Sequence, residues 1–401
     1  MLKSVAIIGA GASGLVAAIV AARNGAKVCV YEKNSKIGKK ILATGNGRCN
    51  ITNKNIQTSN YHGLNSSFVN PAINKFNTSM CIDFFRELGI EMFEGNNGRL
   101  YPKSHQSSSV VELLAYECNI LGVEFLLNFE VDKITKENGK FAIFSAENKK
   151  YADKVLISTG GLAMPTLGSS DSGYKIAKTF GHSIISPCAS LVQLECEDDL
   201  KSINGVKIEG NIEILVDGQS VSKKNGDILF TNYGISGSAI LDVSRSAAKA
   251  LEFQRDVIAM LDLIPEYSKE QLKNILIKRK KFSNKKSLEI WLDGFINSKL
   301  AKFIAKDFPV KKADDLNTKD IVRLVYLFKN MKLKVTGTRG FKSAEVTAGG
   351  INTDEINAQT MESKFQKGLF FSGEVLDIDG DCGGYNLHWA WASGYTVGKN
   401  I

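Results

Sequence analysis

Apolar runs that stop at glycine mark both ends of this chain of 401 residues. Residues 5–8 are hydrophobic and lead into the sequence GAGASG at residues 9–14, and a second apolar run, residues 27–31, ends at Glu32. Residues 369–371 repeat the pattern near the C-terminus. Short apolar runs bounded by glycine are typical of buried strands. We therefore expect both ends of the chain to supply strands to one α/β domain.

The pattern changes twice between these ends. Residues 191–262 hold short alternating stretches, one of which stops at Asp217-Gly218, a dipeptide that favours a tight hairpin turn. Residues 263–334 carry Leu, Ile and Lys at helical spacing. We predict an inserted β-rich domain and a small helical subdomain within a Rossmann-like α/β domain made of residues 1–190 and 335–401.

Each glycine of GAGASG has a mechanical role in binding a dinucleotide. Gly9 permits a tight turn, Gly11 lets the backbone approach a pyrophosphate, and Gly14 lets the following helix lie close to the sheet. A helix that begins near Ala12 directs its N-terminal N–H groups and positive dipole end at the phosphates. Glu32 follows at about the 20-residue spacing where a carboxylate accepts hydrogen bonds from a ribose hydroxyl.

The C-terminal segment decides which dinucleotide is expected. A nicotinamide-binding domain usually completes its site within one contiguous block, whereas an FAD domain often needs the C-terminal segment to hold the ribityl chain and flavin ring. Glu374 and Asp377 follow Gly373 and are placed to accept hydrogen bonds from ribityl hydroxyls, with a solvated turn as the alternative. A helix that opens at residues 384–386 directs its dipole at the N1–O2 edge of the flavin. We therefore predict FAD, bound without a covalent link.

Two interior segments predict further contacts with FAD. Residues 38–53, GKKILATGNGRCNITN, are dense in small residues, amides and cations, which suit a diphosphate and a flavin edge, although a flexible surface loop is the alternative. Cys49 in this segment is either a redox thiol or a packed, unreactive one, and the absence of a CxxC partner from the sequence favours the packed thiol. Thr159, Gly160 and Gly161 follow an apolar run, at a place where a chain crosses closely over a dinucleotide.

The composition is that of a globular protein, with 43% hydrophobic and 23% charged residues. Seven cysteines without CxxC spacing favour reduced thiols in the cytoplasm over disulfides or a metal site. No apolar run in the sequence is long enough to span a membrane, and an apolar strand that starts at residue 5 leaves no room for a signal peptide. We expect a cytoplasmic protein with a small-molecule substrate, no membrane partner and no metal.

The net charge of +9 raises nucleic acid as a partner. Much of the excess lies in two short runs, residues 278–281 and 285–286. No nucleic-acid motif accompanies these runs, so a solvated basic helix face is the favoured interpretation, and nucleic acid is not expected as a partner.

Five stretches of the chain resemble the BaiN-like and aminoacetone-oxidase-like FAD-binding oxidoreductases of bacteria. They are GAGASG (9–14), GKKILATGNGRCNITN (38–53), LFTNYGISG (229–237), VTAGGI (346–351) and GEVLDIDGDCGGYNLHWAWASG (373–394). The resemblance implies an FAD domain, a β-barrel-like insertion and a helical cap. It implies FAD contacts at the matching positions Gly9, Gly11, Ser13, Gly14, Glu32, Lys33, Lys40, Gly47, Arg48, Cys49, Asn50, Thr159, Gly160, Gly373, Glu374, Gly384, Tyr385 and Asn386. It also implies that Val131 meets the adenine through its backbone. Activities within this group are disparate, so the resemblance implies a cofactor and a fold rather than one reaction.

The favoured function is an FAD-dependent oxidoreductase that transfers a hydride between a small organic substrate and flavin N5. The sequence leaves open whether the enzyme is an oxidase or an NAD(P)H-fed reductase. If NAD(P)H is the donor it would dock only transiently, because the sequence has no second GxGxxG motif. Arg48, Tyr385 and His388 are weak candidates for substrate-facing groups because they lie within the flavin-edge motifs, and a structural role is equally compatible with His388.

The alternative function is a flavin-containing protein that associates with nucleic acid through the basic residues 278–286. A third hypothesis is an FAD-bound redox sensor that uses Cys49 or Cys382. The sequence leaves the substrate, the electron donor or acceptor, the oligomeric state and the role of the helical subdomain open.

Overall fold

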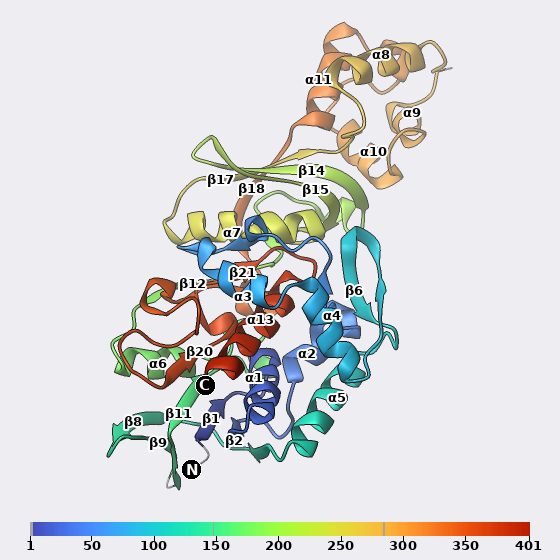
Figure 1. Cartoon of the computed structure of the whole chain (residues 1–401). Coiled ribbons are helices and arrows are strands. Elements are labelled where there is room, and N and C mark those ends of the chain that lie inside the picture. The colour runs from blue at the N-terminus through green and yellow to red at the C-terminus, as the bar shows by residue number, and fades with distance from the viewer. Residues whose placement is uncertain (1–2, 147, 284) are drawn as a thin grey trace. The chain divides into compact units, whose positions relative to one another are not determined.

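The computed structural model describes residues 3–146, 148–283 and 285–401. It divides the chain into two compact units, residues 1–189 with 344–401 and residues 190–343 (Figure 1). We call them the terminal unit and the inserted unit. Each has its own cluster of buried hydrophobic side chains, so each has a core of its own.

A five-stranded parallel sheet in the order β20-β11-β1-β2-β7 is the centre of the terminal unit. Its strands are β1 (Ser4–Ile8), β2 (Lys27–Glu32), β7 (Glu124–Leu127), β11 (Lys154–Ile157) and β20 (Leu369–Phe371). The β20 strand pairs with β11 from Val155↔Leu369 to Ile157↔Phe371. The C-terminal segment therefore completes a sheet that the N-terminal segment begins, as the apolar runs at both ends predicted.

Two helices that are far apart in the sequence pack directly against each other beside this sheet (Figure 1). The α1 helix (Ala12–Arg23) is apolar and buried along most of its length, and α13 (Tyr385–Asn400) lies against it. A Cβ on Gly394 would lie 2.3 Å from the Ser13 carbonyl oxygen, so the two backbones approach closely because glycine stands at the contact. This contact fixes the start of α1 relative to the C-terminal residues.

The remaining elements of the terminal unit surround the sheet. Its other helices are α2 (Lys39–Ala43), α3 (Asn70–Lys75), α4 (Thr78–Glu87), α5 (Ser107–Ile120) and α6 (Ser172–Thr179). Its smaller sheets are β10-β9-β8 (Asn148–Ala152, Lys140–Ser145, Lys133–Glu137), β3-β6-β5 (Thr52–Asn53, Arg99–Pro102, Met92–Glu94), β12-β19 (Ile184–Ser190, Val346–Ile351) and β21-β4 (Asp379–Gly380, Tyr61–His62).

The inserted unit contains a closed barrel in the order β13-β16-β15-β14-β17-β18. Its strands are β13 (Leu194–Cys196), β14 (Lys207–Val216), β15 (Gln219–Thr231), β16 (Gly234–Ser236), β17 (Val257–Asp262) and β18 (Met331–Thr338). Asp217 and Gly218, with φ of 48° and 81°, form the two-residue turn between β14 and β15 that the Asp-Gly dipeptide predicted. The α7 helix (Ser238–Glu252) buries an apolar face against the barrel.

The sixth barrel strand lies beyond the expected β-rich segment 191–262. The β18 strand pairs with β17 on one side and β13 on the other, and thereby closes the barrel. Its buried positions alternate at Met331, Leu333 and Val335, which is the two-residue period of a strand with one buried face. The boundary expected between residues 334 and 335 therefore falls inside a strand of the barrel.

Four helices stand between β17 and β18 in the sequence. They are α8 (Lys269–Lys280), α9 (Leu288–Asp293), α10 (Ser298–Ala305) and α11 (Thr318–Lys329), and the short α12 (Gly340–Ser343) follows the barrel. The α8 helix begins with a capping box formed by Ser268 and Gln271 and buries Leu272 and Leu276. We propose to treat residues 263–330 as a helical module of the inserted unit. Among the described residues, no helix combines the length and the apolar character that a membrane span needs.

Candidate functional site

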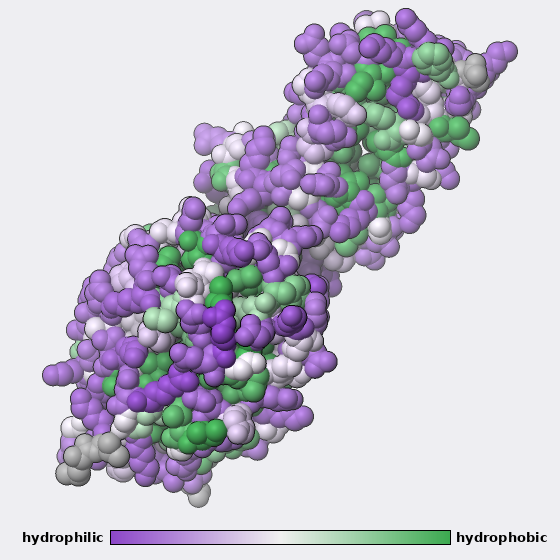
Figure 2. Space-filling view, turned by 45° about the vertical axis from the view of Figure 1, so that its right-hand side comes forward, coloured by the Kyte–Doolittle hydropathy of each residue, from purple (hydrophilic) through white to green (hydrophobic). Residues whose placement is uncertain are grey.

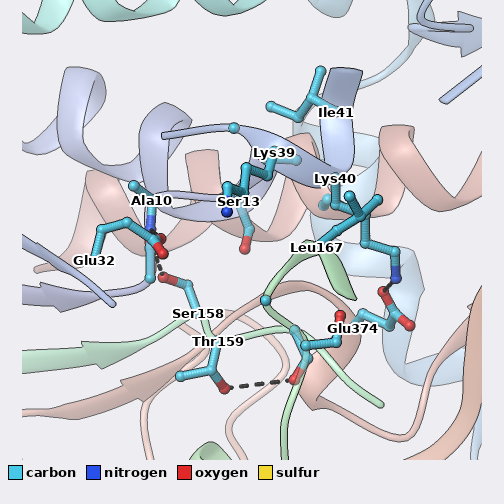
Figure 3. Close-up of a pocket in the computed structure, with 18 of the residues that line it drawn as sticks. Ala10, Ser13, Glu32, Lys39, Lys40, Ile41, Ser158, Thr159, Leu167 and Glu374 are labelled. Atoms are coloured by element: carbon cyan, nitrogen blue, oxygen red, sulfur yellow. Dashed lines mark hydrogen bonds and ion pairs between the residues drawn. The ribbon is translucent and has the colours of Figure 1, made fainter. Parts of the chain in front are cut away.

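A pocket of the terminal unit lies at the carboxyl ends of β1, β2 and β11 (Figure 3). In open α/β sheets, ligands bind outside the carboxyl ends of the parallel strands. The pocket brings together, of the residues predicted to contact FAD, Gly9, Gly11, Ala12, Ser13, Glu32, Lys33, Lys40, Val131, Thr159, Gly160, Glu374 and Asn386. Residues from both ends of the chain therefore line one cavity.

The three glycines of GAGASG meet different surroundings. Gly9 has a φ of 106°, and an added Cβ would lie 2.6 Å from the Ser158 carbonyl oxygen. A Cβ on Gly14 would lie 2.1 Å from the Gly9 carbonyl oxygen, whereas a Cβ on Gly11 would meet no atom within 4 Å. Gly9 and Gly14 therefore allow close backbone approaches, and Gly11 leaves open space in the pocket wall.

The start of α1 is suited to an anion. Gly11 is its N-cap and forms no side-chain cap, and its first turn carries no acidic residue. The first N–H groups of a helix lack partners within the helix, and the helix dipole adds partial positive charge there. Because Gly11, Ala12 and Ser13 line the pocket, this helix end fits a pyrophosphate.

Glu32 is buried at the end of β2 and held from two sides. One carboxylate oxygen accepts from the backbone N–H of Ala10 at 2.9 Å, and the other accepts from the backbone and side-chain N–H groups of Asn34 at 2.8 and 2.7 Å. Figure 3 shows this carboxylate beside the start of α1. A carboxylate offers about four acceptor positions, so Glu32 is positioned and retains capacity to accept from ribose hydroxyls.

An ion pair joins α2 to the C-terminal residues at the pocket. The Lys40 ammonium lies 2.6 Å from one carboxylate oxygen of Glu374, whose other oxygen accepts from the backbone N–H of Thr347 at 2.8 Å. The two side chains are 26% and 19% exposed. Glu374 is therefore held within the protein by two partners, a role that the sequence did not predict beside the expected ribityl contact.

Several predicted residues lie outside this pocket, namely Gly14, Gly47, Arg48, Cys49, Asn50, Gly161, Gly373, Asp377, Gly384 and Tyr385. Part of this set gathers where residues 48–53 meet residues 382–385. The Asn53 amide donates to the Gly383 carbonyl oxygen at 2.9 Å, and a Cβ on Gly384 would lie 2.6 Å from the Thr52 carbonyl oxygen. We call these two segments the loop cluster. It is a second place at which the two ends of the chain meet.

Two side chains of the loop cluster have distinct chemistry. The Asn50 side-chain oxygen is buried without a hydrogen-bond partner among the residues that the structure describes. Such an orphaned acceptor is compatible with a bound group that donates to it. Burial raises the pKa of the Cys49 thiol to about 12, so this thiol is protonated and unreactive at neutral pH, in agreement with a packed role.

The structure separates the three candidates for substrate-facing groups. Burial lowers the pKa of His388 to about 4, and its Nδ1 lies 2.8 Å from the Thr52 hydroxyl, so it is a neutral histidine of the core. Tyr385 is half-buried, with its ring edge-on to Tyr61 at 6.4 Å. Arg48 is exposed, and its guanidinium lies over the Tyr101 ring at 4.7 Å.

Two segments that line the pocket were not predicted, residues 167–170 with Ser172 and residues 345–346. The small polar run Gly168-Ser169-Ser170 was a usable signal, because such residues are typical of loops near phosphates. Residues 345–346 carry no such signal, and the contacts of the neighbouring Thr347 explain their place. The Thr347 hydroxyl accepts from the backbone N–H groups of Leu162 and Ala163. Within the ranges that the structure describes, no three metal-ligating side chains come together.

Comparison with known proteins decides the family. Residues 3–400 match the family described as HI0933-like protein Rossmann domain. This chain belongs to that family. The family comprises FAD-binding oxidoreductases, so the chain is an FAD-dependent oxidoreductase and FAD is its cofactor. The open cradle at Gly11, the uncapped start of α1 and the fixed Glu32 fit this cofactor. The predictions of family, fold class, cofactor and enzyme class are confirmed.

Three relatives match over nearly the whole chain. The 3-dehydro-bile acid delta(4,6)-reductase of Clostridium scindens is 35% identical over 408 residues, covering 99% of this chain and 98% of that protein. The ribosomal RNA dihydrouridine synthase of Haemophilus influenzae is 33% identical over 415 residues, covering 98% and 97%. The ribosomal RNA dihydrouridine synthase of Escherichia coli is 31% identical over 401 residues, covering 98% and 97%.

Proposed function

We propose that this chain is an NAD(P)H-fed reductase that adds a hydride to a carbon–carbon double bond conjugated to a carbonyl group in a small organic substrate. The names of its relatives support this reaction. A 3-dehydro-bile acid with double bonds at positions 4 and 6 is a conjugated ketone, and dihydrouridine arises from a uracil ring by saturation of a bond conjugated to a ring carbonyl. Both names describe the same bond type in very different molecules.

The structural observation that supports the flavin part of the proposal is the cradle at the start of α1, with Glu32 fixed beside it. Bound FAD would supply hydride transfer from NAD(P)H to the substrate carbon β to the carbonyl, and a proton from solvent or from a donor group would complete the α carbon. In this proposal the N–H groups of α1 hold the pyrophosphate, Glu32 binds the ribose hydroxyls and Val131 borders the adenine.

The loop cluster supplies our candidates for the flavin and substrate side. We propose that Asn50, Gly384 and Tyr385 border the flavin, because an unpartnered buried acceptor lies there beside the start of α13. Arg48 is the remaining candidate for a substrate-facing group, since a cation stabilises the negative charge that develops on the carbonyl oxygen. His388 is not retained, because its imidazole is fully buried in the core with Nδ1 beside the Thr52 hydroxyl, and is therefore out of reach of a substrate.

A second candidate substrate is a uracil base within RNA, and one observation favours it. Residues 263–330 contain sixteen Lys and Arg residues and eight Asp and Glu residues, so their net charge is +8 in a chain whose total is +9. The rest of the chain is close to neutral. A charge excess confined to one module is typical of proteins that bind an anionic polymer.

The first experiment is anaerobic mixing of the purified, FAD-loaded protein with NADH and with NADPH. We expect the flavin absorption bands to bleach, and then to recover when a 3-oxo-4,6-diene steroid or a uridine-containing RNA is added. Flavin that stays oxidised with both nicotinamides would replace this proposal with an oxidase or a dehydrogenase fed by its own substrate. Arg48→Ala should lower the rate of reoxidation by substrate while leaving the rate of bleaching unchanged.

A further inference from the structure

The charge of the helical module is concentrated at one end by the fold. Ser287 follows the C-terminal end of α8 in the sequence and forms an isolated antiparallel bridge with Lys312. Two backbone hydrogen bonds fix the pair, from Leu288 N–H to the Lys311 carbonyl oxygen and from Ala313 N–H to the Lys286 carbonyl oxygen. The bridge therefore adds two sequence-distant lysines to the run that the sequence shows. We call the exposed set the basic end: Lys278, Lys281, Phe282, Lys285, Lys286, Lys311 and Lys312.

Not every cation in this region is available to a partner. The Arg279 guanidinium lies over the rings of Trp291 and Phe295 at 5.6 and 5.1 Å and donates to the Trp291 carbonyl oxygen. The Lys280 ammonium donates to the Leu316 carbonyl oxygen. These two side chains hold the module together, so we leave them out of the basic end.

The exposed lysines of the basic end remain largely uncompensated. Lys278, Lys281 and Lys285 form no ion pair with any residue that the structure describes. Two carboxylates lie nearby, and that of Asp314 accepts from the Lys285 backbone N–H and the Ser283 hydroxyl. Residues 278–286 and 311–315 together hold eight cations and only these two carboxylates, Asp314 and Asp315.

Helix electrostatics explains only part of this arrangement. Cations in the last turn of α8 complement the negative end of its dipole, which accounts for Lys278 without any partner. It does not account for Lys285, Lys286, Lys311 and Lys312, which lie outside the helix. Nor does it account for Phe282, whose side chain is 75% exposed amid these lysines. Figure 2 likewise shows hydrophobic residues exposed among hydrophilic ones on this module.

We propose that the basic end docks single-stranded or looped RNA, with its lysines at the phosphates and Phe282 stacked on an unpaired base. This inference rests on the second candidate substrate of the proposed function, and it names the surface that would recognise it. Base stacking on an exposed aromatic side chain beside cations is the common mode of binding unpaired nucleic acid. An anionic membrane would also attract lysines, but α8 lacks the continuous exposed apolar face by which interfacial helices bind.

The charge part of this proposal is tested with two matched double variants of the full, FAD-loaded protein. Lys281→Gln/Lys285→Gln neutralises the basic end, and Lys269→Gln/Lys302→Gln removes two exposed lysines elsewhere on the module. Binding of a labelled, uridine-rich 20-nucleotide RNA is followed by fluorescence anisotropy from about 50 to 200 mM salt. The first variant should bind about tenfold more weakly, with a log–log salt slope shallower by up to about 1.4, and the control should change less than about twofold.

The stacking part is tested with Phe282 alone. Phe282→Ala should weaken RNA binding roughly tenfold without changing the salt slope, because a stacked ring releases no counterions. Phe282→Trp should bind RNA about as tightly as the wild type, since any flat aromatic ring can stack on a base. The pair separates stacking from a fold defect, because a collapsed module would not be rescued by a larger ring.

Equal losses of RNA affinity in the two double variants would overturn the proposal, and so would an unchanged RNA affinity in Phe282→Ala. It would also be overturned if the wild type binds vesicles with 30% phosphatidylserine and the basic-end variants lose this vesicle binding but keep their RNA binding. Flavin bleaching by NAD(P)H is measured on every variant. Bleaching that persists while RNA binding fails would reject the docking surface and leave the proposed reductase standing. If NAD(P)H does not bleach the flavin of the wild type, the proposed reductase is rejected, and the RNA-binding measurements alone then decide whether the basic end is a docking surface.

Discussion

The strand–helix–strand segment of residues 4–32 and the loop cluster both hold residues predicted to contact FAD, yet they are built in opposite ways. In the first, β1, α1 and β2 place Gly11 and Glu32 by the regular geometry of neighbouring elements. In the loop cluster, the place of Asn50 is set by long-range contacts with residues such as Gly384. In regular helices and strands, the spacing of residues in the sequence determines their relative positions. In irregular loops, these positions depend on contacts with residues that are distant in the sequence.

The largest effect should come from paired substitutions in the first region. Gly14→Ala places a Cβ 2.1 Å from a rigid backbone oxygen and should lower the free energy of unfolding by about 3 kcal/mol, despite the better helix propensity of alanine. Gly11→Ala meets no atom and should leave the FAD-free protein within about 0.5 kcal/mol of wild type. Its methyl group should nevertheless weaken FAD binding at least tenfold. Urea unfolding and FAD titration of both variants check this, and equal destabilisation would contradict it.

The next effect concerns acid stability at His388, which contacts Thr52 of the loop cluster. The pKa of His388 is lowered to about 4 in the folded protein, so the unfolded chain binds the extra proton first and stability falls as the pH drops from 6.5 towards 4. Between pH 7.5 and pH 5 this histidine should cost about 2 kcal/mol. Burial also lowers the pKa of His182, so the measured quantity is the difference between wild type and His388→Gln. The same pH dependence in both proteins would refute the buried neutral state.

A smaller effect is expected at the ion pair that joins the two ends. Lys40→Gln should weaken FAD binding about three- to tenfold, because a partly exposed pair contributes about 1 kcal/mol and Glu374 would keep only its Thr347 partner. Lys36→Gln, at an exposed lysine outside the pocket, is the control. Isothermal titration with FAD at low and high salt measures both. An unchanged affinity for Lys40→Gln would separate this pair from the cofactor site.

The smallest expected effect is at Cys49, whose thiol should not react with an alkylating reagent in the native protein. Because the pKa of Cys49 is raised to about 12, its thiolate fraction at pH 8 is about one in ten thousand. Iodoacetamide should leave Cys49 unmodified in the native protein and label it in denaturant, as peptide mass spectrometry would detect. Rapid native labelling would revive the redox-sensor hypothesis for this residue.

The sequence predicted the features that depend on short-range regularity. Spacing alone placed Gly9, Gly11, Gly14 and Glu32 on a strand, a turn and a helix, and the Asp217-Gly218 turn followed from the backbone freedom of that dipeptide. It failed at β18, where alternating Lys and apolar residues from Met331 onward resemble the helical stretch before them. Residues 345–346 were missed because the fold, rather than local spacing, brings them to the pocket, whereas the small polar run at residues 168–170 was a local signal that was not used.

The charge pattern of the sequence also did not reveal every residue of the basic end. Phe282 lies within the basic run of the sequence, but a count of charged residues does not identify an aromatic side chain as a possible contact. Lys311 and Lys312 join that run only through the bridge at Ser287, which spacing does not reveal.

The pairing of β20 with β11 also sets an order of assembly. The inserted unit is contiguous in the sequence, so it can fold on the ribosome as soon as residues 190–343 have emerged. The sheet of the terminal unit lacks its edge strand β20, and α1 lacks its contact with α13, until residues 369–400 have been made. Until then α1 exposes apolar side chains that α13 later covers, and the pocket lacks Glu374 and Asn386, so we expect FAD to bind only after residues 374–386 have emerged.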